Sequence, residues 1–482
     1  MATTAEASLV DDLRSLLGPE GVLSGNDELV VYECDGYTIE KNQPDVVVFP
    51  TSTDEVVEIV RLANRHDVPF LPRGAGTSLA GGCLPVGGGV MIALTRMKRI
   101  LEINTRDRYA VVEPGLVNLH LTQRLAGTGY HYAPDPSSQG ACTIGGNVAT
   151  NSGGPHTLKY GVTVNHVLGL QIVLPDGSVV ETGGPTEDNP GYDLTGLIVG
   201  SEGTFGICTQ ATVRITRNPE GYRTMLAVFE TVDDATNTIS ALIGAGIVPA
   251  ALEMMDQGIL QAVEAKFHFG FPLDAGAVLI IEVDGLEAGL DDEAKKIMAF
   301  CREHHARDVQ RAGSDAERAL LWKCRKQAFG AVGRLSPSYC TQDGVVPRTQ
   351  LPHILREITR IGKKYDIRIV NVFHAGDGNI HPILLFDERN AEQVGRVLRA
   401  SHEILDACLR VGGSVTGEHG IGVEKLDFMP KLFSPEDLAT MLKVREAFNP
   451  DGRLSPGKML PTAGACGMEH IEQTKPSRRA AL

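Results

Sequence analysis

The chain has 482 residues, of which 42% are hydrophobic and 22% charged, and its formal net charge is −15. This length exceeds the size at which one hydrophobic core usually stops growing, so we expect two principal domains. The negative charge repels phosphate backbones, and no apolar run approaches the roughly 20 residues of a spanning helix, so we exclude nucleic-acid-binding and transmembrane proteins.

The N-terminal residues and the cysteines indicate a reducing compartment. The first residues lack the basic start and apolar core of a signal peptide, so we expect a cytoplasmic protein, peripheral to a membrane at most through partners. The nine cysteines are scattered and never arranged as C-x-x-C. This spacing argues against an iron–sulfur cluster in the chain itself.

The first half begins with helical and β-α-β patterns. Residues 1–40 are predicted to form an N-terminal helical segment, with an amphipathic helix over 9–18. A strand is predicted at Asp45–Pro50. Ser52 and Glu55 form a capping-box signature, which predicts a helix directly after that strand.

Glycine-rich segments then alternate with strands. A strand at Val68–Pro72 precedes a loop over 73–82, and a strand at Val90–Leu94 follows it. A second glycine-rich zone spans 134–154, and a hairpin is predicted over 168–180 because Asp-Gly favours its tight turn.

A third glycine cluster, 200–206, leads into a strand over 207–215. The sequence pattern changes at Arg217–Gly221. From there on, glycine-rich segments give way to longer predicted helices that alternate with strands such as Ala277–Val283. We therefore predict an α+β chain with one domain over 41–221, a second over 222–461, and a mobile tail over 462–482.

The loop at 73–82 does not match a Rossmann fingerprint. Gly74 and Gly76 fit G-x-G-x-x-G, but Leu79 occupies the third glycine position, and the following residues do not open a helix. Consecutive backbone N–H groups can still cradle a diphosphate, with Thr77 and Ser78 adding hydroxyl donors. Three such segments in one domain predict a bound dinucleotide.

The second domain carries a set of residues suited to metal chemistry. His374 and His381 lie seven positions apart, and Glu418-His419 follows between glycines. Two histidines and a carboxylate can hold Zn²⁺, with Mn²⁺ or Fe²⁺ as alternatives, and leave coordination positions open for a substrate. We predict His374, His381 and Glu418 as metal ligands and His419 as a general base.

Several motifs together carry a family resemblance. They are the three glycine segments and the runs Trp322–Phe329, Phe373–Pro382 and Gly417–Gly422. With these motifs the chain resembles the FAD-linked D-2-hydroxy-acid dehydrogenases of the vanillyl-alcohol oxidase superfamily. The resemblance implies a PCMH-type FAD-binding domain, followed by an α+β FAD-linked oxidase C-terminal domain that holds the substrate and the metal.

The resemblance also implies the cofactor and its contacts. It implies FAD, which we expect to be non-covalent because the loop over 73–82 contains no histidine or cysteine. The implied FAD-binding residues are Arg73, Gly74, Ala75, Gly76, Thr77, Ser78, Pro134, Asp135, Ser137, Ser138, Gly140, Thr143, Gly146, Asn147, Asn151, Gly153, Glu202, Gly203 and Ile207.

The expected reaction is oxidation of a small 2-hydroxy acid with hydride transfer to the flavin. Arg325 is the candidate for binding the substrate carboxylate because guanidinium offers a bidentate fork, and Lys326 is the second choice. Ile383 stands where the D-2-hydroxyglutarate branch places an asparagine, which favours the monocarboxylates glycolate or D-lactate.

Three functional readings stay open at this point. A glycolate-oxidising enzyme implies a second flavin-domain subunit and an iron–sulfur subunit as partners that receive electrons. A stand-alone D-lactate dehydrogenase would instead use a quinone or cytochrome acceptor. A non-catalytic FAD-binding assembly subunit is the third reading, and it should lack the histidine and glutamate residues that are present here.

Overall fold

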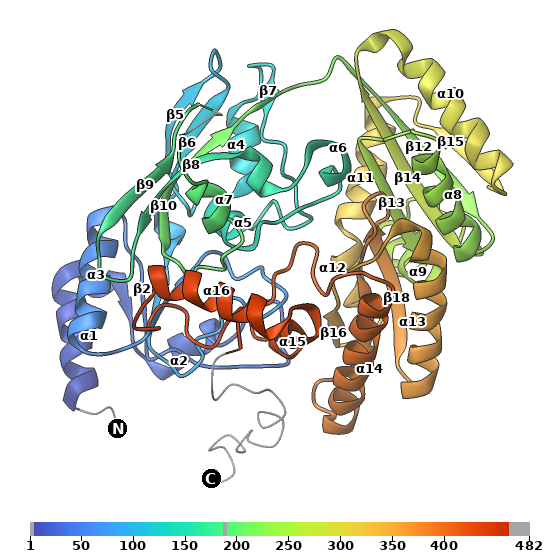
Figure 1. Ribbon diagram of the computed structural model, residues 1–482. Helices are drawn as coiled ribbons and strands as arrows, with labels where there is room; N and C mark the ends of the chain where they lie inside the picture. The colour runs from blue at the N-terminus through green and yellow to red at the C-terminus, as the bar shows by residue number, and fades with distance from the viewer. Residues whose placement is uncertain (1–3, 187–189, 462–482) are drawn as a thin grey trace.

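The computed structural model describes residues 4–186 and 190–461, and its two α+β halves lie side by side (Figure 1). The predicted tail at 462–482 lies outside the described residues. None of the described helices is long and apolar enough to cross a membrane.

A small, partly parallel sheet opens the first half. Its order is β1-β2-β4-β3, and β4 pairs in parallel with both β2 and β3. The strands are β1 (Val22–Leu23), β2 (Val46–Val48), β3 (Phe70–Arg73) and β4 (Val90–Ala93). The helices beside it are α1 (Thr4–Leu17), α2 (Asn26–Leu29) and α3 (Thr53–Arg65).

The predicted cap of α3 is present. Ser52 Oγ accepts the backbone N–H of Glu55 at 3.2 Å, while the Glu55 carboxylate accepts the N–H of Thr51 at 2.6 Å. Ser52 thus satisfies an amide group that a helix start leaves free, whereas Glu55 bonds the residue before the N-cap and does not complete the predicted capping box. The capped helix buries Val56, Ile59 and Val60 against the sheet.

A second, antiparallel sheet completes this half, in the order β5-β6-β10-β8-β9. The predicted hairpin is confirmed, because β8 and β9 pair in antiparallel register from Gly169–Gly183 to Val173–Val179. The strands are β5 (Ile100–Asn104), β6 (Tyr109–Val112), β8 (Val167–Val173), β9 (Val179–Gly183) and β10 (Ile207–Arg214); β7 (Tyr130–His131) pairs with β11 (Thr216–Arg217).

The glycine-rich zone at 134–154 contains a short helix that the sequence did not predict. This helix, α5 (Ile144–Thr150), is capped by Thr143, whose Oγ1 accepts the Gly146 N–H at 3.2 Å. The cap offsets the poor helix propensity of two consecutive glycines. The other short helices of this half are α4 (Asn118–Arg124), α6 (Thr157–Tyr160) and α7 (Leu194–Ile198).

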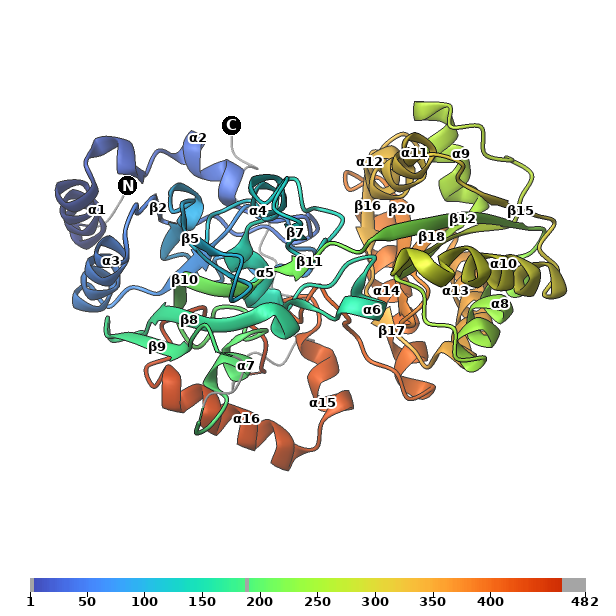
Figure 2. The ribbon, with the colours of Figure 1, turned by 90° about the horizontal axis from the view of Figure 1, so that it is seen from above.

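The second half is built on one large sheet with helices on both faces (Figure 2). Its main path is β15-β12-β14-β13-β18-β19-β17, and β16 joins through β20. The strands are β12 (Gly221–Phe229), β13 (Ala251–Asp256), β14 (Ala277–Gly285), β15 (Asp308–Arg311), β16 (Ser338–Thr341), β17 (Gly344–Val345), β18 (Arg368–His374), β19 (Asn379–Ile380) and β20 (Pro382–Phe386).

Alternate strand residues bury against different helix layers. On β14, Leu279 and Ile281 face one core and Val278 and Ile280 the other, which explains why this predicted strand is apolar throughout. One layer contains α8 (Val232–Gly244), α10 (Glu287–Glu303), α13 (Leu351–Tyr365) and α14 (Ala391–Arg410). The other contains α9 (Gln257–Phe267), α11 (Asp315–Lys326) and α12 (Ala328–Val332).

The end of the described chain returns to the first half. Helix α15 (Met429–Leu432) leads to α16 (Pro435–Phe448), which lies along that half in Figure 1. The rings of Phe448 and Phe205 stack with centroids 4.8 Å apart, and Leu454 forms a β-bridge with Phe70. Residues 435–461 therefore complete the packing of the first half.

Candidate active site

A large cavity of about 440 Å³ connects the two halves. All three glycine segments line it, and Lys326, Phe329, Tyr339, Glu418 and His419 reach it from the second half. Many of the predicted FAD-binding residues are on its wall: Arg73, Gly74, Ala75, Gly76, Thr77, Ser78, Ser137, Ser138, Thr143, Gly146, Asn147, Glu202 and Gly203.

The remaining predicted FAD-binding residues do not line this cavity. They are Pro134, Asp135, Gly140, Asn151, Gly153 and Ile207. Gly153 instead lines a smaller cavity of about 160 Å³, together with His374 and Glu418. Because Glu418 lines both spaces, it stands between the large and the small cavity.

Close backbone packing explains the glycine at position 74. A Cβ atom there would lie 2.5 Å from Thr143 Oγ1, the cap of α5. At this point the backbone of the first glycine segment lies directly against the Thr143 hydroxyl and the Gly146 backbone of the second. Such contacts leave N–H groups and a hydroxyl beside the cavity, which suits a phosphate-bearing ligand.

The Arg73 side chain braces the first glycine segment. Its guanidinium donates to the Cys34 carbonyl at 3.0 Å and to Cys83 Sγ at 3.2 Å, and it lies 5.5 Å from the centre of the Tyr32 ring. The side chain is thus committed to protein contacts, although the residue lines the cavity.

The three predicted metal ligands meet at the junction of the halves. His374 ends β18, His381 separates β19 from β20, and Glu418 lies in the loop after α14. Glu418 Oε1 is 3.3 Å from His374 Nε2 and 3.2 Å from His381 Nε2. Three ligand-type atoms that converge within 4.8 Å fit a single divalent ion.

The charges in this cluster depend on one another. Burial disfavours a charge on His374, but Glu253 and Glu418 outweigh it and raise its pKa well above the ordinary value. Burial also opposes ionisation of Glu418, yet His374 and His381 hold its pKa well below the usual range. Glu418 Oε2 is buried and has no hydrogen-bond partner in the described parts of the chain. A divalent cation would balance this carboxylate.

The predicted base, His419, lies against His381 and faces the large cavity. The two rings stack with centroids 5.1 Å apart at an angle of 9°. Burial lowers the pKa of His419 to about 4, so its imidazole is neutral near neutral pH and can accept a proton. Nδ1 of His419 has no hydrogen-bond partner among the residues the structure describes.

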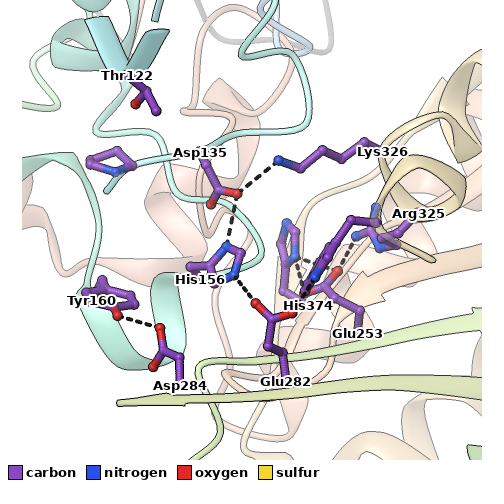
Figure 3. A network of polar contacts seen from close by, with 12 residues as sticks. Thr122, Asp135, His156, Tyr160, Glu253, Glu282, Asp284, Arg325, Lys326 and His374 are labelled. Atoms are coloured by element: carbon purple, nitrogen blue, oxygen red, sulfur yellow. Dashed lines mark hydrogen bonds and ion pairs between the residues drawn. The ribbon is translucent and has the colours of Figure 1, made fainter. Parts of the chain in front are cut away.

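The two candidate cations on α11 have different surroundings, as Figure 3 shows. Lys326 lines the large cavity, and its Nζ lies 3.3 Å from Asp135 Oδ2. Arg325 is fully buried and lines neither cavity, with Nη2 2.6 Å from Glu253 Oε2. The predicted contact of Arg325 with substrate therefore stays a prediction, and Lys326 is the cation already on the wall.

Ion pairs join the two halves beside this site (Figure 3). His156 of the first half lies 3.0 Å from Asp135 and 3.5 Å from Glu282 on β14. Burial opposes a charge on His156, but Asp135 and Glu282 together raise its pKa to about 10. Tyr160 donates to the carboxylate of Asp284 at 2.5 Å. The imidazolium of His156 thus bridges a carboxylate from each half.

A carboxylate of the first half also holds the loop that carries Glu418 and His419. Glu202 accepts the backbone N–H groups of Ile421 and Gly422, each at 2.7 Å. Glu202 has a left-handed backbone with φ of 52° and follows Gly200 in the third glycine segment. The third glycine segment is therefore hydrogen-bonded directly to the loop that carries Glu418 and His419.

Sequence reasoning missed two buried carboxylates in the site. Glu253 lies on β13 and its two oxygens are 2.8 and 3.0 Å from His374 Nδ1. Asp343 is fully buried between β16 and β17, near His381. One signal was available, because Glu253 interrupts the apolar run Ala251–Met255, and an acidic residue inside a buried strand requires a partner.

Comparison with known families agrees with this geometry. Residues 44–183 match the family described as "FAD binding domain", and residues 218–459 match the family described as "FAD linked oxidases, C-terminal domain". The chain therefore belongs to the FAD-linked oxidases. The predicted order of an FAD-binding domain followed by an FAD-linked oxidase C-terminal domain is confirmed. The prediction that the protein is an FAD-linked oxidoreductase is confirmed as well.

Individual relatives make the comparison more specific. The chain is 43% identical over 453 residues to glycolate oxidase subunit GlcD of Escherichia coli K12, covering 93% of this chain and 91% of the relative. It is 34% identical to the mitochondrial D-lactate dehydrogenase [cytochrome] of Arabidopsis thaliana, covering 87% and 74%. The fold is similar to that of p-cresol methylhydroxylase with substrate bound, with a TM-score of 0.81, 19% identity, and 95% and 97% coverage.

Proposed function

We propose that this protein oxidises a small 2-hydroxy monocarboxylate, glycolate first and D-lactate second, with FAD in the large cavity and a divalent metal at His374, His381 and Glu418. One observation carries the proposal: the cavity formed by the FAD-binding segments opens onto Glu418 and His419. The relatives named for glycolate oxidase and D-lactate dehydrogenase support the substrate class.

The residues present fit both groups. The three glycine segments offer closely packed backbone around the large cavity, and Glu418 offers a buried oxygen that no described residue satisfies. Non-covalent FAD is proposed because the loop over 73–82 lacks a histidine or cysteine. When bound, the flavin supplies a hydride acceptor and the metal, Zn²⁺ for preference, lowers the pKa of an alcohol group.

The protein's own residues position the substrate and move one proton. Lys326 presents a positive charge to the substrate carboxylate from the cavity wall, and Arg325, which is paired with Glu253, is the other candidate. Neutral His419 accepts the proton of the substrate hydroxyl. The carboxylate of Asp343, which raises the pKa of His419, then stabilises the imidazolium that forms.

Electrons must leave through another protein or a quinone. The cysteines of the chain are not spaced to hold an iron–sulfur cluster. The relative's name, glycolate oxidase subunit, supports a complex, and we propose a second flavin-domain subunit and an iron–sulfur subunit as partners at the cytoplasmic side. A stand-alone D-lactate dehydrogenase is the second candidate, favoured by the relative of that name.

Anaerobic flavin reduction tests the proposal. The purified protein, with its metal content measured, is mixed with glycolate, D-lactate, L-lactate or D-2-hydroxyglutarate while flavin absorbance is followed. We expect glycolate and D-lactate to bleach the flavin, a chelator to prevent it, and His419→Asn to slow it by at least about 100-fold. Full turnover in His419→Asn would refute the general-base role, and a metal-loaded protein that no substrate reduces would refute the substrate class.

A further inference from the structure

Asp343 occupies a central place under the loop that carries Glu418 and His419. It lies in the short connection between β16 and β17, and its side chain is fully buried. It is not one of the proposed metal ligands, and in the proposed proton transfer it only stabilises the imidazolium of His419 from nearby. A fully buried carboxylate is costly unless its oxygens are paired, so its contacts reveal what it does.

One oxygen of Asp343 binds the loop through four donors. Oδ2 accepts the Thr416 hydroxyl at 2.7 Å and the backbone N–H groups of Gly417 at 2.9 Å, Glu418 at 3.1 Å and His419 at 2.8 Å. Three consecutive N–H groups on one oxygen form an anion-binding nest. This arrangement fixes the backbone of the metal ligand and of the base together.

The other oxygen faces a metal ligand. Oδ1 lies 3.8 Å from His381 Nδ1, an electrostatic contact rather than a hydrogen bond, and neither atom has a hydrogen-bond partner among the described residues. A carboxylate near Nδ1 favours the tautomer with the proton on Nδ1. Nε2, which is 3.2 Å from Glu418, is then free to bind a cation.

A second cation site around Asp343 is the competing interpretation. Atoms of Asp343, His381 and His419 do lie within 4.8 Å of one another. However, the Lys425 ammonium group is fully buried 3.7 Å from Asp343 Oδ2 and already supplies a positive charge. A divalent ion would be repelled by this lysine, so the contacts favour an orienting role.

We propose that Asp343 is a positioning residue, which sets the backbone of Glu418 and His419 with one oxygen and the ring of His381 with the other. This inference rests on the proposed metal site. It explains why a carboxylate is required: an amide has one acceptor and one donor. In Asp343→Asn, either the nest or His381 Nδ1 therefore faces an N–H donor instead of an oxygen.

The test compares Asp343→Asn with Asp256→Asn in the full-length, FAD-loaded protein. Asp256 also accepts backbone N–H groups, from Ile259 at 3.0 Å and Asn371 at 2.7 Å, but it is not among the predicted metal ligands or their partners. Zn²⁺ affinity is measured by titrating chelator-treated protein in competition with a fluorescent chelator. kcat, KM and thermal stability are measured in parallel.

We expect Asp343→Asn to weaken Zn²⁺ binding by about 10- to 100-fold and to lower kcat more than it changes KM, while Asp256→Asn affects neither. Equal Zn²⁺ affinity and kcat in Asp343→Asn and wild type would overturn the positioning role. Failure of the wild type itself to bind Zn²⁺ would instead count against the proposed metal site. In that event the kcat of Asp343→Asn alone tests the positioning role. A kcat equal to that of the wild type would mean that His419 does not depend on Asp343 for its position.

Thr416→Val provides a second route in case Asp343→Asn does not fold. It removes one of the four donors to Oδ2 and leaves the carboxylate in place. We expect a folded, FAD-loaded Thr416→Val protein to lose at least about threefold in kcat, the effect of roughly one weakened hydrogen bond. A wild-type kcat in that variant would also overturn the proposal.

Discussion

Replacing His156 by glutamine should abolish an alkaline titration at the junction of the two halves. His156 has a pKa raised to about 10 from an ordinary 6.5, because Asp135 and Glu282 outweigh the effect of burial. The folded protein thus holds this proton more tightly than the unfolded chain. The stability that His156 contributes is complete below pH 6.5 and is lost as the pH rises through about 10.

The size of this stability contribution follows from the difference between the pKa of His156 in the folded protein and in the unfolded chain. Each pH unit between the two pKa values changes the free energy of unfolding by at most about 1.4 kcal/mol. Burial of the partners makes this contribution larger than that of a surface pair, and we expect a total loss on the order of 3 kcal/mol. Glutamine at position 156 cannot ionise, so its variant should lack this component at every pH.

Trp322, the single tryptophan, provides a local assay. Its ring lies 5.1 Å from the His156 ring, so its fluorescence should report the charge on the imidazole. We expect a fluorescence titration with a midpoint near 10 in the wild type and none in His156→Gln. Urea unfolding of both proteins across the window should show the stability difference shrinking as pH rises. A midpoint near 6.5, or a difference independent of pH, would refute the reasoning.

Three further substitutions test the site. Gly74→Ala would place Cβ 2.5 Å from Thr143 Oγ1, so we expect about tenfold weaker FAD binding, seen in the flavin-to-protein absorbance ratio; normal flavin content would contradict the packing argument. Gly153→Ala would place Cβ 2.9 Å from Glu418 Oε2, and Zn²⁺ affinity should fall about tenfold, whereas unchanged affinity would place the metal elsewhere. Lys326→Met should raise the substrate KM by about tenfold or more with a smaller change in kcat, and an unaltered KM would leave Arg325 as the carboxylate-binding residue.

Local signals in the sequence predicted the elements that depend on local contacts. The helix α3 follows from the Ser52 cap, and the β8–β9 hairpin from its Asp-Gly turn. The helix α5 was not predicted because glycines at 145 and 146 disfavour a helix, and only the Thr143 cap and the packing around it outweigh that preference.

The site was predictable only in part, for a similar reason. His374, His381 and Glu418 could be grouped because glycine and aspartate surround them, and the structure brings them together. The roles of Glu253 and Asp343 depend on partners that lie far away in the sequence. The different surroundings of Arg325 and Lys326 depend on the orientation of α11, which no local pattern encodes.

The return of the chain to the first half has a consequence for the order of folding during synthesis. Ser455 donates to the Gly203 carbonyl at 2.9 Å, and Lys458 donates to the Gly82 carbonyl at 2.7 Å. Two of the glycine segments around the large cavity are thus supported by residues that are synthesised after the whole sheet of the second half. Although domains usually fold in the order of their synthesis, this FAD-binding half cannot reach its final packing until residues 455–458 have been made. We therefore expect flavin capture to follow the synthesis of the second half.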